Sequence, residues 1–235
     1  MVLCIMQPYF FPYLGYFDLI NRCDKWIVFD TSKYIRHGWM NRNRILHPRQ
    51  GWRYIMVPVK KHNHDTPINQ IEIFPPASWR PHILGHLSHY KKTAPFYRET
   101  LHLVEACLAS ETTSLLALNT RILGLVSGYL GIRWQHEVFS TVQLDLQGAK
   151  TPGDMAVRMA IVLGADEYIN RPGGAKQFDR AKFEAHGIKL TIQPQFTFAY
   201  ACPGYTSVPD LSVIDALMWN SPKVIKAHLD AQRAQ

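Results

Sequence analysis

The first thirty or so residues combine two uniformly apolar runs with a segment of helical periodicity between them. Residues 2–6 (VLCIM) are too few for a helix and too uniformly apolar for a half-exposed strand, so they predict a strand buried on both faces. Pro8 and Pro12 then interrupt regular structure, and apolar positions recur at helical spacing from Gly15 onward. A second apolar run at residues 26–29 completes a predicted β-α-β unit with a loop at the carboxyl end of its first strand.

A long segment without periodicity follows this unit. Residues 31–51 contain several loop formers and predict a long loop with one helical turn near residues 41–45. Residues 52–59 and 68–74 have strand-like patterns, and we expect them to pair as antiparallel edge strands around a turn at residues 62–65.

From residue 79 the pattern becomes helical. We expect helices over residues 80–92, 95–110 and 113–130, with Pro95 in the first turn of the second helix and Gly131 ending the third. Three successive helices without an intervening strand predict an inserted helical cap over residues 79–131.

The remaining residues return to an alternation of strands and helices. We expect strands over residues 138–142, 167–170 and 188–192, and helices over residues 152–163 and 176–186. Thr151, Pro152 and Asp154 have the spacing of a capping box at the start of the first of these helices. The pattern as a whole predicts an α/β protein with a Rossmann-like, mostly parallel sheet, whose core comprises residues 1–78 and 132–235.

Composition narrows the class of protein. Of the 235 residues 47% are hydrophobic and 19% are charged, which favours a folded chain with a substantial core. No apolar run approaches the roughly 20 residues that a membrane span needs, and the first residues lack the basic segment of a signal peptide. We therefore expect a cytoplasmic protein without membrane association, and we leave open whether it forms a homo-oligomer.

Positive charge is concentrated in the first half of the chain. Residues 1–98 have a net charge of +9, residues 99–235 have −1, and no acidic residue occurs between Asp30 and Asp65. This distribution predicts an anionic ligand. A nucleic acid is the less favoured partner, because the aromatic residues cluster in one loop and the second half would interrupt a long basic track.

Candidate site residues lie mostly at predicted strand ends, where open parallel sheets bind ligands. For substrate binding we select polar, basic and glycine residues beside these ends: Gln7, Tyr9, Asn41, Arg42, Asn43, Lys60, Arg171, Gly173 and Gly174. Arginine binds carboxylates and phosphates with two parallel hydrogen bonds, and glycines between a strand and a helix let backbone amides approach an anion. For catalysis we select Tyr13, Tyr16 and Asp30, with Asp30 as a general base or, alternatively, as a cap for its own loop. We expect the groups around Tyr13, Arg42 and Arg171 to converge on one cleft.

Three histidines on one predicted helix suggest a metal site. His82, His86 and His89 stand at i, i+4 and i+7, so their side chains project from one face and could bind a divalent cation such as zinc. The alternative is a partly exposed polar face in a chain with 11 histidines.

Three motifs carry a resemblance to a known family. The opening MQPYFFPYLGYFDLI with Asp30, the segment GWMNRNRI at residues 38–45 and LSVIDAL at residues 211–217 resemble the WbqC-like family. That resemblance implies a role in bacterial surface-polysaccharide or other secondary biosynthesis. The opening stretch is also similar to the start of HxGH nucleotidylyltransferases, with Tyr13-Leu14-Gly15-Tyr16 at the motif positions. Tyrosines there can donate hydrogen bonds but supply no positive charge.

These observations predict a biosynthetic enzyme. We expect a transferase that acts on an anionic small molecule, such as a nucleotide-activated sugar, an amino acid or an acyl donor. The alternative is a non-catalytic protein that binds a glycan or a nucleic acid.

Overall fold

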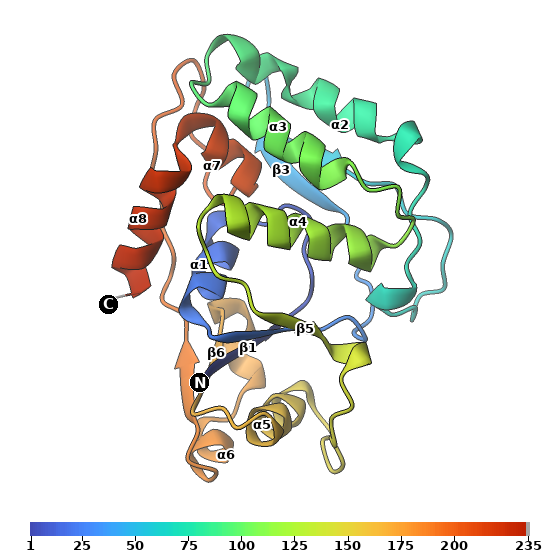
Figure 1. Ribbon diagram of the computed structural model, residues 1–235, viewed down its shortest axis with the longest axis vertical. Coiled ribbons are helices and arrows are strands. Elements are labelled where there is room, and N and C mark those ends of the chain that lie inside the picture. The colour runs from blue at the N-terminus through green and yellow to red at the C-terminus, as the bar shows by residue number, and fades with distance from the viewer. Residues whose placement is uncertain (234–235) are drawn as a thin grey trace.

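The computed structural model describes residues 1–233 and contains a five-stranded sheet, which lies in the lower half of the view in Figure 1. The strands are β1 (Val2–Met6), β2 (Lys25–Val28), β5 (His136–Val138), β6 (Glu167–Asn170) and β7 (Lys189–Ile192). They are ordered β5-β2-β1-β6-β7, and every neighbouring pair is parallel. This is the strand order of the Rossmann fold, so the predicted α/β class and Rossmann-like sheet are confirmed.

The central strands are apolar because helices cover both faces of the sheet. Along β1, Cys4 and Met6 pack into one hydrophobic cluster with α1 (Leu14–Arg22), whereas Leu3 and Ile5 pack into a second cluster with α5 (Pro152–Val162). Helix α6 (Arg180–Glu184) adds to the second face and α8 (Pro222–Arg233) packs beside α1. A strand buried on both faces requires apolar residues at every position, which explains the run in residues 2–6.

Helices and a hairpin form the other part of the molecule (Figure 1). Helices α2 (Arg80–Leu87), α3 (Tyr97–Leu108) and α4 (Leu115–Tyr129) correspond to the three expected over residues 79–131. Helix α7 (Val213–Trp219) packs against α3, where the Thr100 hydroxyl donates to the Leu217 carbonyl at 2.9 Å. No helix over these residues was expected from the sequence.

The prediction of a loop over residues 31–51 is wrong. Strand β3 (Arg42–Leu46) lies inside that segment and pairs antiparallel with β4 (Trp52–Met56). Its inward positions are Asn43 and Ile45, both buried, so an asparagine with internal partners replaced one of the apolar residues expected on a strand. The expected pairing of residues 52–59 with 68–74 is reduced to one bridge between Val59 and Ile73.

Several other boundaries also differ from the prediction. Helix α2 ends at Leu87, and residues 88–92 form a 3-10 helix; α6 is short, because residues 172–177 form another. The expected strand at 138–142 is β5 followed by a 3-10 turn. The capping box of Thr151 and Asp154 is present as predicted.

Across the described residues, every helix is too short or too polar to cross a bilayer.

Candidate functional site

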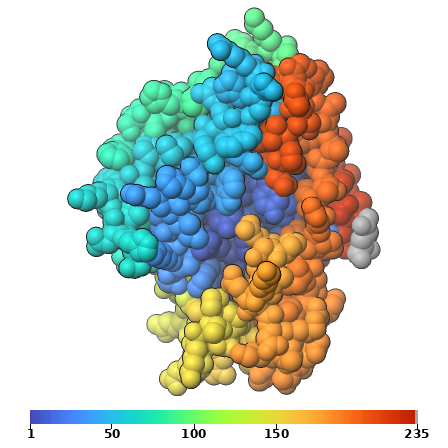
Figure 2. All heavy atoms as spheres, turned by 180° about the vertical axis from the view of Figure 1, so that it is seen from behind, coloured from blue at the N-terminus to red at the C-terminus, as the bar shows by residue number. Residues whose placement is uncertain are grey.

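A cleft of about 390 Å³ opens at the carboxyl edge of the sheet, beside the ends of the neighbouring strands β1 and β6. From β1 the chain builds the sheet toward β5 on one side, and β6 and β7 extend it on the other side. The order in which strands are added to the sheet therefore reverses between β1 and β6. The loops that follow these two strands diverge, which leaves a crevice of the kind where open α/β sheets bind ligands. In Figure 2 this region is hollowed, with atoms of the N-terminal segment at its floor between the blue and the orange segments.

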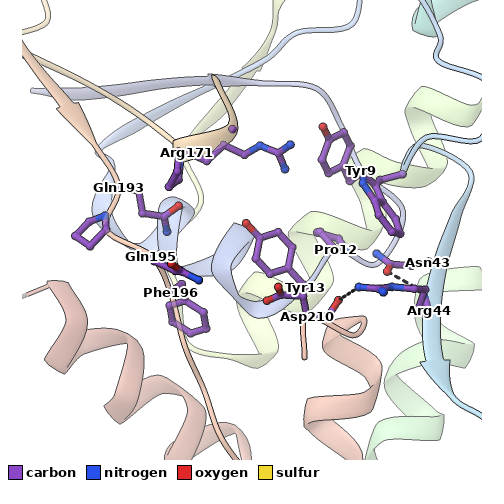
Figure 3. Close-up of a pocket in the computed structure, with 14 residues that line it drawn as sticks. Tyr9, Pro12, Tyr13, Asn43, Arg44, Arg171, Gln193, Gln195, Phe196 and Asp210 are labelled. Carbon is purple, nitrogen blue, oxygen red and sulfur yellow. Dashed lines mark hydrogen bonds between the residues drawn. The ribbon is translucent and has the colours of Figure 1, made fainter. Parts of the chain in front are cut away.

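We call this hollow the switch-point cleft. Its lining comes from the segments after β1, β6 and β7, from β3 with the residues before it, and from the turn before α7: Tyr9, Pro12, Tyr13, Trp39, Asn43, Arg44, Arg171, Pro172, Gly173, Gln193, Pro194, Gln195, Phe196 and Asp210 (Figure 3). Five of these, Tyr9, Tyr13, Asn43, Arg171 and Gly173, are residues that the sequence proposed for the site.

The loop after β1 is held rigidly by polar groups from distant segments. Its Phe10 and Phe11 are fully buried, and their carbonyls accept hydrogen bonds from the Asn43 side chain at 3.1 and 2.9 Å. Asn119 of α4 donates to the Pro8 carbonyl at 3.0 Å, and Ser212 donates to the Phe11 carbonyl at 2.8 Å. Three separate elements therefore fix the backbone that carries Tyr9 and Tyr13.

Tyr13 stands at the start of α1 and points into the cleft (Figure 3). Two residues on, Gly15 leaves room for this ring, because a Cβ there would overlap Cε2 of Tyr13. Burial raises the pKa of the Tyr13 phenol, and the nearby Arg171 guanidinium opposes this shift only in part. The phenol therefore stays protonated at neutral pH and offers a hydrogen-bond donor.

Arg171 directly follows β6 and extends over the cleft. Its backbone N–H donates to the Asn170 side chain at 2.8 Å, and its guanidinium carbon lies 5.5 Å from the centre of the Tyr9 ring. Its guanidinium forms no ion pair with any carboxylate in residues 1–233. A cation that faces a cleft without an acidic partner is available to an anionic ligand.

Gln193 contributes an oriented acceptor. Its amide nitrogen donates to the Gly15 carbonyl at 2.9 Å and to the Asp18 carboxylate at 2.6 Å. The same carboxylate accepts from Arg22 at 2.8 Å, and Arg22 also donates to the carbonyl of Gln232 in α8. With its nitrogen fixed in this way, the amide oxygen of Gln193 faces the cleft (Figure 3).

Arg44 and Asp210 close the opposite side of the cleft. The Arg44 guanidinium donates to the backbone carbonyl of Asp210 at 3.1 Å and lies between the rings of Trp39 and Trp52, 5.4 and 5.3 Å from their centres. The Arg44 carbonyl accepts from the backbone N–H of Ser212 at 2.8 Å. Two hydrogen bonds from one residue thus fix the turn that presents Asp210, whose φ angle is +53°.

A second cavity of about 380 Å³ adjoins the switch-point cleft. The two share Tyr9, Arg171 and Gly173, and the second is lined mainly by apolar side chains of β1, α5 and the residues after β2 and β6. Gln7 and Gly174 line this second cavity, where the Gln7 amide donates to Ser32 at 2.9 Å. Arg171 thus stands where the two cavities meet.

Several predicted residues lie outside both cavities. Tyr16 is buried, and its hydroxyl donates to the Gln7 carbonyl at 2.7 Å. Asn41 is buried between the Tyr34 hydroxyl and the Val57 carbonyl, and Arg42 lies over the Tyr54 ring at 4.1 Å. The structure therefore does not bring Tyr16, Asn41 and Arg42 to the lining of either cavity with Arg171.

Two further predicted residues have polar partners away from the cleft. Asp30 is fully buried and accepts from the Ser140 backbone N–H at 3.0 Å and the Ser140 hydroxyl at 2.6 Å, so it joins the ends of β2 and β5. These bonds hold a segment 110 positions away and not the loop that follows Asp30. Lys60 lies 2.7 Å from the Glu72 carboxylate on the surface.

The predicted histidine site is also wrong. The helix ends at Leu87, so His89 lies in a 3-10 segment and not on the helical face of His82 and His86. Residues 1–233 contain no group of three histidine, cysteine or acidic side chains placed to hold a metal ion. Burial lowers the pKa of both His86 and His89, and the ring of His89 packs 4.0 Å from that of Tyr90.

Sequence reasoning missed Arg44, Gln193 and Asp210. Gln193 directly follows the apolar run at 188–192, so the strand-end rule that selected Arg171 also applies to it. Arg44 lies in the same basic segment as Arg42, so the sequence near them does not show which of the two lines the cleft. Asp210 comes from a turn far along the chain, and the bonds of this turn with Arg44 and with the Phe11 carbonyl bring it to the cleft.

Comparison with known proteins gives two matches. A family model described as the WbqC-like protein family matches residues 7–227. A Mycobacterium tuberculosis protein (strain ATCC 25618 / H37Rv), "Uncharacterized protein Rv1507c", is 28% identical over 188 residues, which cover 80% of this chain and 79% of the relative. No solved structure gives a significant match. The first match spans all residues of the switch-point cleft.

Proposed function

The chain belongs to the WbqC-like protein family, and from its cleft we propose that it is a biosynthetic transferase for an anionic small molecule. The substrate class is a nucleotide-activated sugar, an amino acid or an acyl donor, used in polysaccharide or secondary metabolism. The observation that supports this proposal best is the position of Arg171. It is a cation without an acidic partner in the described chain, and it stands where two cavities meet.

The geometry fits a reaction with two substrates. Transfer brings a donor and an acceptor together, and two adjoining cavities that share Arg171 and Tyr9 provide space for both. The switch-point cleft is the more polar of the two in its side chains, with Arg171, Tyr13 and Gln193 as candidate contacts for the anionic substrate.

Each of these side chains has a distinct part in the proposal. Arg171 binds the anionic group, and the protonated phenol of Tyr13 donates a second hydrogen bond to it. The Gln193 oxygen accepts from a hydroxyl or amine of the substrate. Fixed donors of this kind stabilise negative charge that develops on a leaving group, because they need no rearrangement during the reaction.

A thermal-shift screen followed by calorimetry tests the proposal. The screen uses nucleotides, nucleotide sugars and divalent metals, since ligands of the native state raise the apparent melting temperature. For a nucleotide sugar that binds, Arg171→Ala should weaken affinity by about 1.5–3 kcal/mol, or roughly ten- to a hundredfold, the usual value of a hydrogen bond to a charged group.

Arg42→Ala is the matched control. Arg42 is also an arginine without a carboxylate partner in the described residues, but it lies over Tyr54 outside both cavities, so its loss should leave affinity unchanged. Equal losses in the two variants, or no loss in Arg171→Ala, would contradict the proposal.

The alternative function is non-catalytic binding of a glycan or nucleic acid, and the exposed side of the β3–β4 hairpin favours it. Arg42, Arg44, Trp52, Tyr54 and Met56 share this side, and Trp52 is 42% exposed. Aromatic rings beside arginines can stack bases or sugar rings. A thermal shift with oligonucleotides or acidic oligosaccharides alone, removed by Trp52→Ala but not by Arg171→Ala, would favour this function.

A further inference from the structure

Three charged side chains line the switch-point cleft, Arg44, Arg171 and Asp210, and the last two do not pair with each other. Arg171 and Asp210 both line it, and Asp210 is the single acidic side chain among its described lining residues. Neither forms an ion pair within 4.0 Å anywhere in residues 1–233. Asp210 is exposed and Arg171 is half-buried, so a ligand in the cleft can reach both charges from solvent.

The separation follows from how the two residues are held. Arg171 leaves the end of β6 and lies against Tyr9, whereas the turn of Asp210 is fixed by hydrogen bonds of the Asp210 carbonyl and the Ser212 backbone N–H with Arg44. The Tyr13 ring stands between them in Figure 3, and burial raises the pKa of its phenol, with a smaller opposing effect of Arg171 and a smaller additional effect of Asp210. The two charges thus face the cleft from opposite sides of Tyr13.

Arg44 lies beside Asp210 but forms no ion pair with its carboxylate. Its guanidinium donates to the Asp210 backbone carbonyl and is otherwise placed between two indole rings, so the carboxylate itself has no cationic partner in the described chain. The cleft therefore offers a cation at one end and an anion at the other. The complementary ligand carries both charges, and the uncharged side chains between them can contact its middle.

We propose that the substrate in this cleft carries an amino group as well as its anionic group, with the ammonium bound by Asp210 and the anion by Arg171. Amino-sugar phosphates, nucleotide-linked amino sugars and amino acids have this chemistry. The inference rests on the proposed function, because it takes the anionic substrate of Arg171 as given. To that substrate it adds an amino group that Asp210 recognises.

A pair of ligands that differ in one group tests the inference. Glucosamine 6-phosphate and glucose 6-phosphate share the phosphate and the ring but differ in an ammonium against a hydroxyl. Calorimetry at pH 7 with the full-length protein should give about tenfold tighter binding of glucosamine 6-phosphate, as expected for a hydrogen bond between charged groups.

Asp210→Asn removes the charge and keeps the turn, since asparagine also tolerates a positive φ. This variant should bind the two ligands with about equal affinity, while its affinity for glucose 6-phosphate stays at the wild-type value or rises slightly. Asp145→Asn is the control, because Asp145 is an exposed aspartate paired with Arg158 and lines neither cavity. It should keep the wild-type preference.

The outcomes separate the two proposals. Equal binding of both ligands by the wild type, or a preference that persists in Asp210→Asn, overturns the amino-group inference and leaves the anion site intact. Binding of neither ligand, or binding that Arg171→Ala does not weaken, counts against the anion site and therefore overturns both.

Discussion

Asp210 and Asp215 are five positions apart in the chain, yet they have opposite surroundings. Asp210 lies on the rim of the switch-point cleft, and its carboxylate has no cationic partner among the described residues. Asp215 is fully buried in α7 and accepts hydrogen bonds from the hydroxyls of Tyr90 and Tyr200, the latter at 2.6 Å, and from the backbone N–H of Leu46 at 3.3 Å.

The difference separates a structural carboxylate from one that is free to bind. Three donors from three segments surround Asp215, so it joins α7, β3, the 3-10 helix after α2 and the segment after β7. A buried polar group with all its partners contributes to folding, whereas a cleft-facing one without partners is available to a ligand. We call the Asp215 group and its three donors the Asp215 cluster, and the predictions below test it against the cleft.

The largest expected effect is on folding, from Asp215→Ala. This change leaves the buried Tyr90 phenol and the half-buried Tyr200 phenol without their acceptor, so the free energy of unfolding should fall by about 3 kcal/mol. The Leu46 amide keeps its hydrogen bond to the Tyr90 hydroxyl at 3.0 Å. Urea unfolding followed by circular dichroism measures the free energy of unfolding. Asp210→Asn is the comparison and should change the midpoint little. If Asp215→Ala lowers the free energy of unfolding as little as Asp210→Asn does, the hydrogen bonds of Asp215 do not stabilise the fold as proposed.

The second prediction disturbs the cleft and leaves the Asp215 cluster untouched. Gly15→Ala places a methyl group against the Tyr13 ring and 3.2 Å from Cβ of Phe196, so the ring must move. Affinity for the anionic ligand should fall by about 1.4 kcal/mol, or roughly tenfold, the cost of losing one hydrogen bond to a charged group. Calorimetry measures the affinity. The free energy of unfolding should change by less than the binding free energy. Alanine is more favourable than glycine in a helix by about 1 kcal/mol, and this gain offsets part of the cost of moving the ring.

The smallest effect concerns pH. Burial raises the pKa of the Asp215 carboxyl above its usual value of 3.8, although its hydrogen bonds oppose the shift. Between 3.8 and the raised value the folded protein binds more protons than the unfolded chain, so this group's contribution to stability is present at low pH and is lost as pH rises.

Asp215→Asn isolates that contribution. The variant keeps one acceptor oxygen and does not titrate, so the difference in unfolding free energy between wild type and variant should shift against the wild type as pH rises from about 4. Subtracting the two curves cancels other groups, among them Asp154, whose pKa is lowered to about 2 mainly by its hydrogen bond with Lys182. Parallel curves for the two proteins would show that Asp215 does not titrate differently on folding.

The sheet could be predicted from the sequence because burial on both faces leaves a local signal. Uniform apolar runs at residues 2–6 and 26–29 correspond to β1 and β2, and the capping box at Thr151 begins α5 as expected. The hairpin gave no such signal. In β3 the buried Asn43 replaces an apolar residue, and its partners are carbonyls more than 30 positions earlier.

The same limit applies to the site. Strand ends are local features, so Tyr9, Tyr13 and Arg171 could be selected and do line the cleft. The strand-end rule also selected Asp30, but Ser140, 110 positions away, occupies both of its oxygens. Arg42 and Arg44 look alike in sequence, and only the fold places Arg44 beside Asp210 and Arg42 on Tyr54.

The orientation of Gln193 links the cleft to the far end of the chain. Its amide is fixed by Asp18, Asp18 pairs with Arg22, and Arg22 donates to the carbonyl of Gln232 in the last turn of α8. Helix α8 contributes no residue to the lining of the cleft, but it is part of the support for one of its acceptors. Shortening the C-terminus or fusing a tag close to Arg233 therefore alters a scaffold of the site, and proteins prepared for ligand screening should keep this end unmodified.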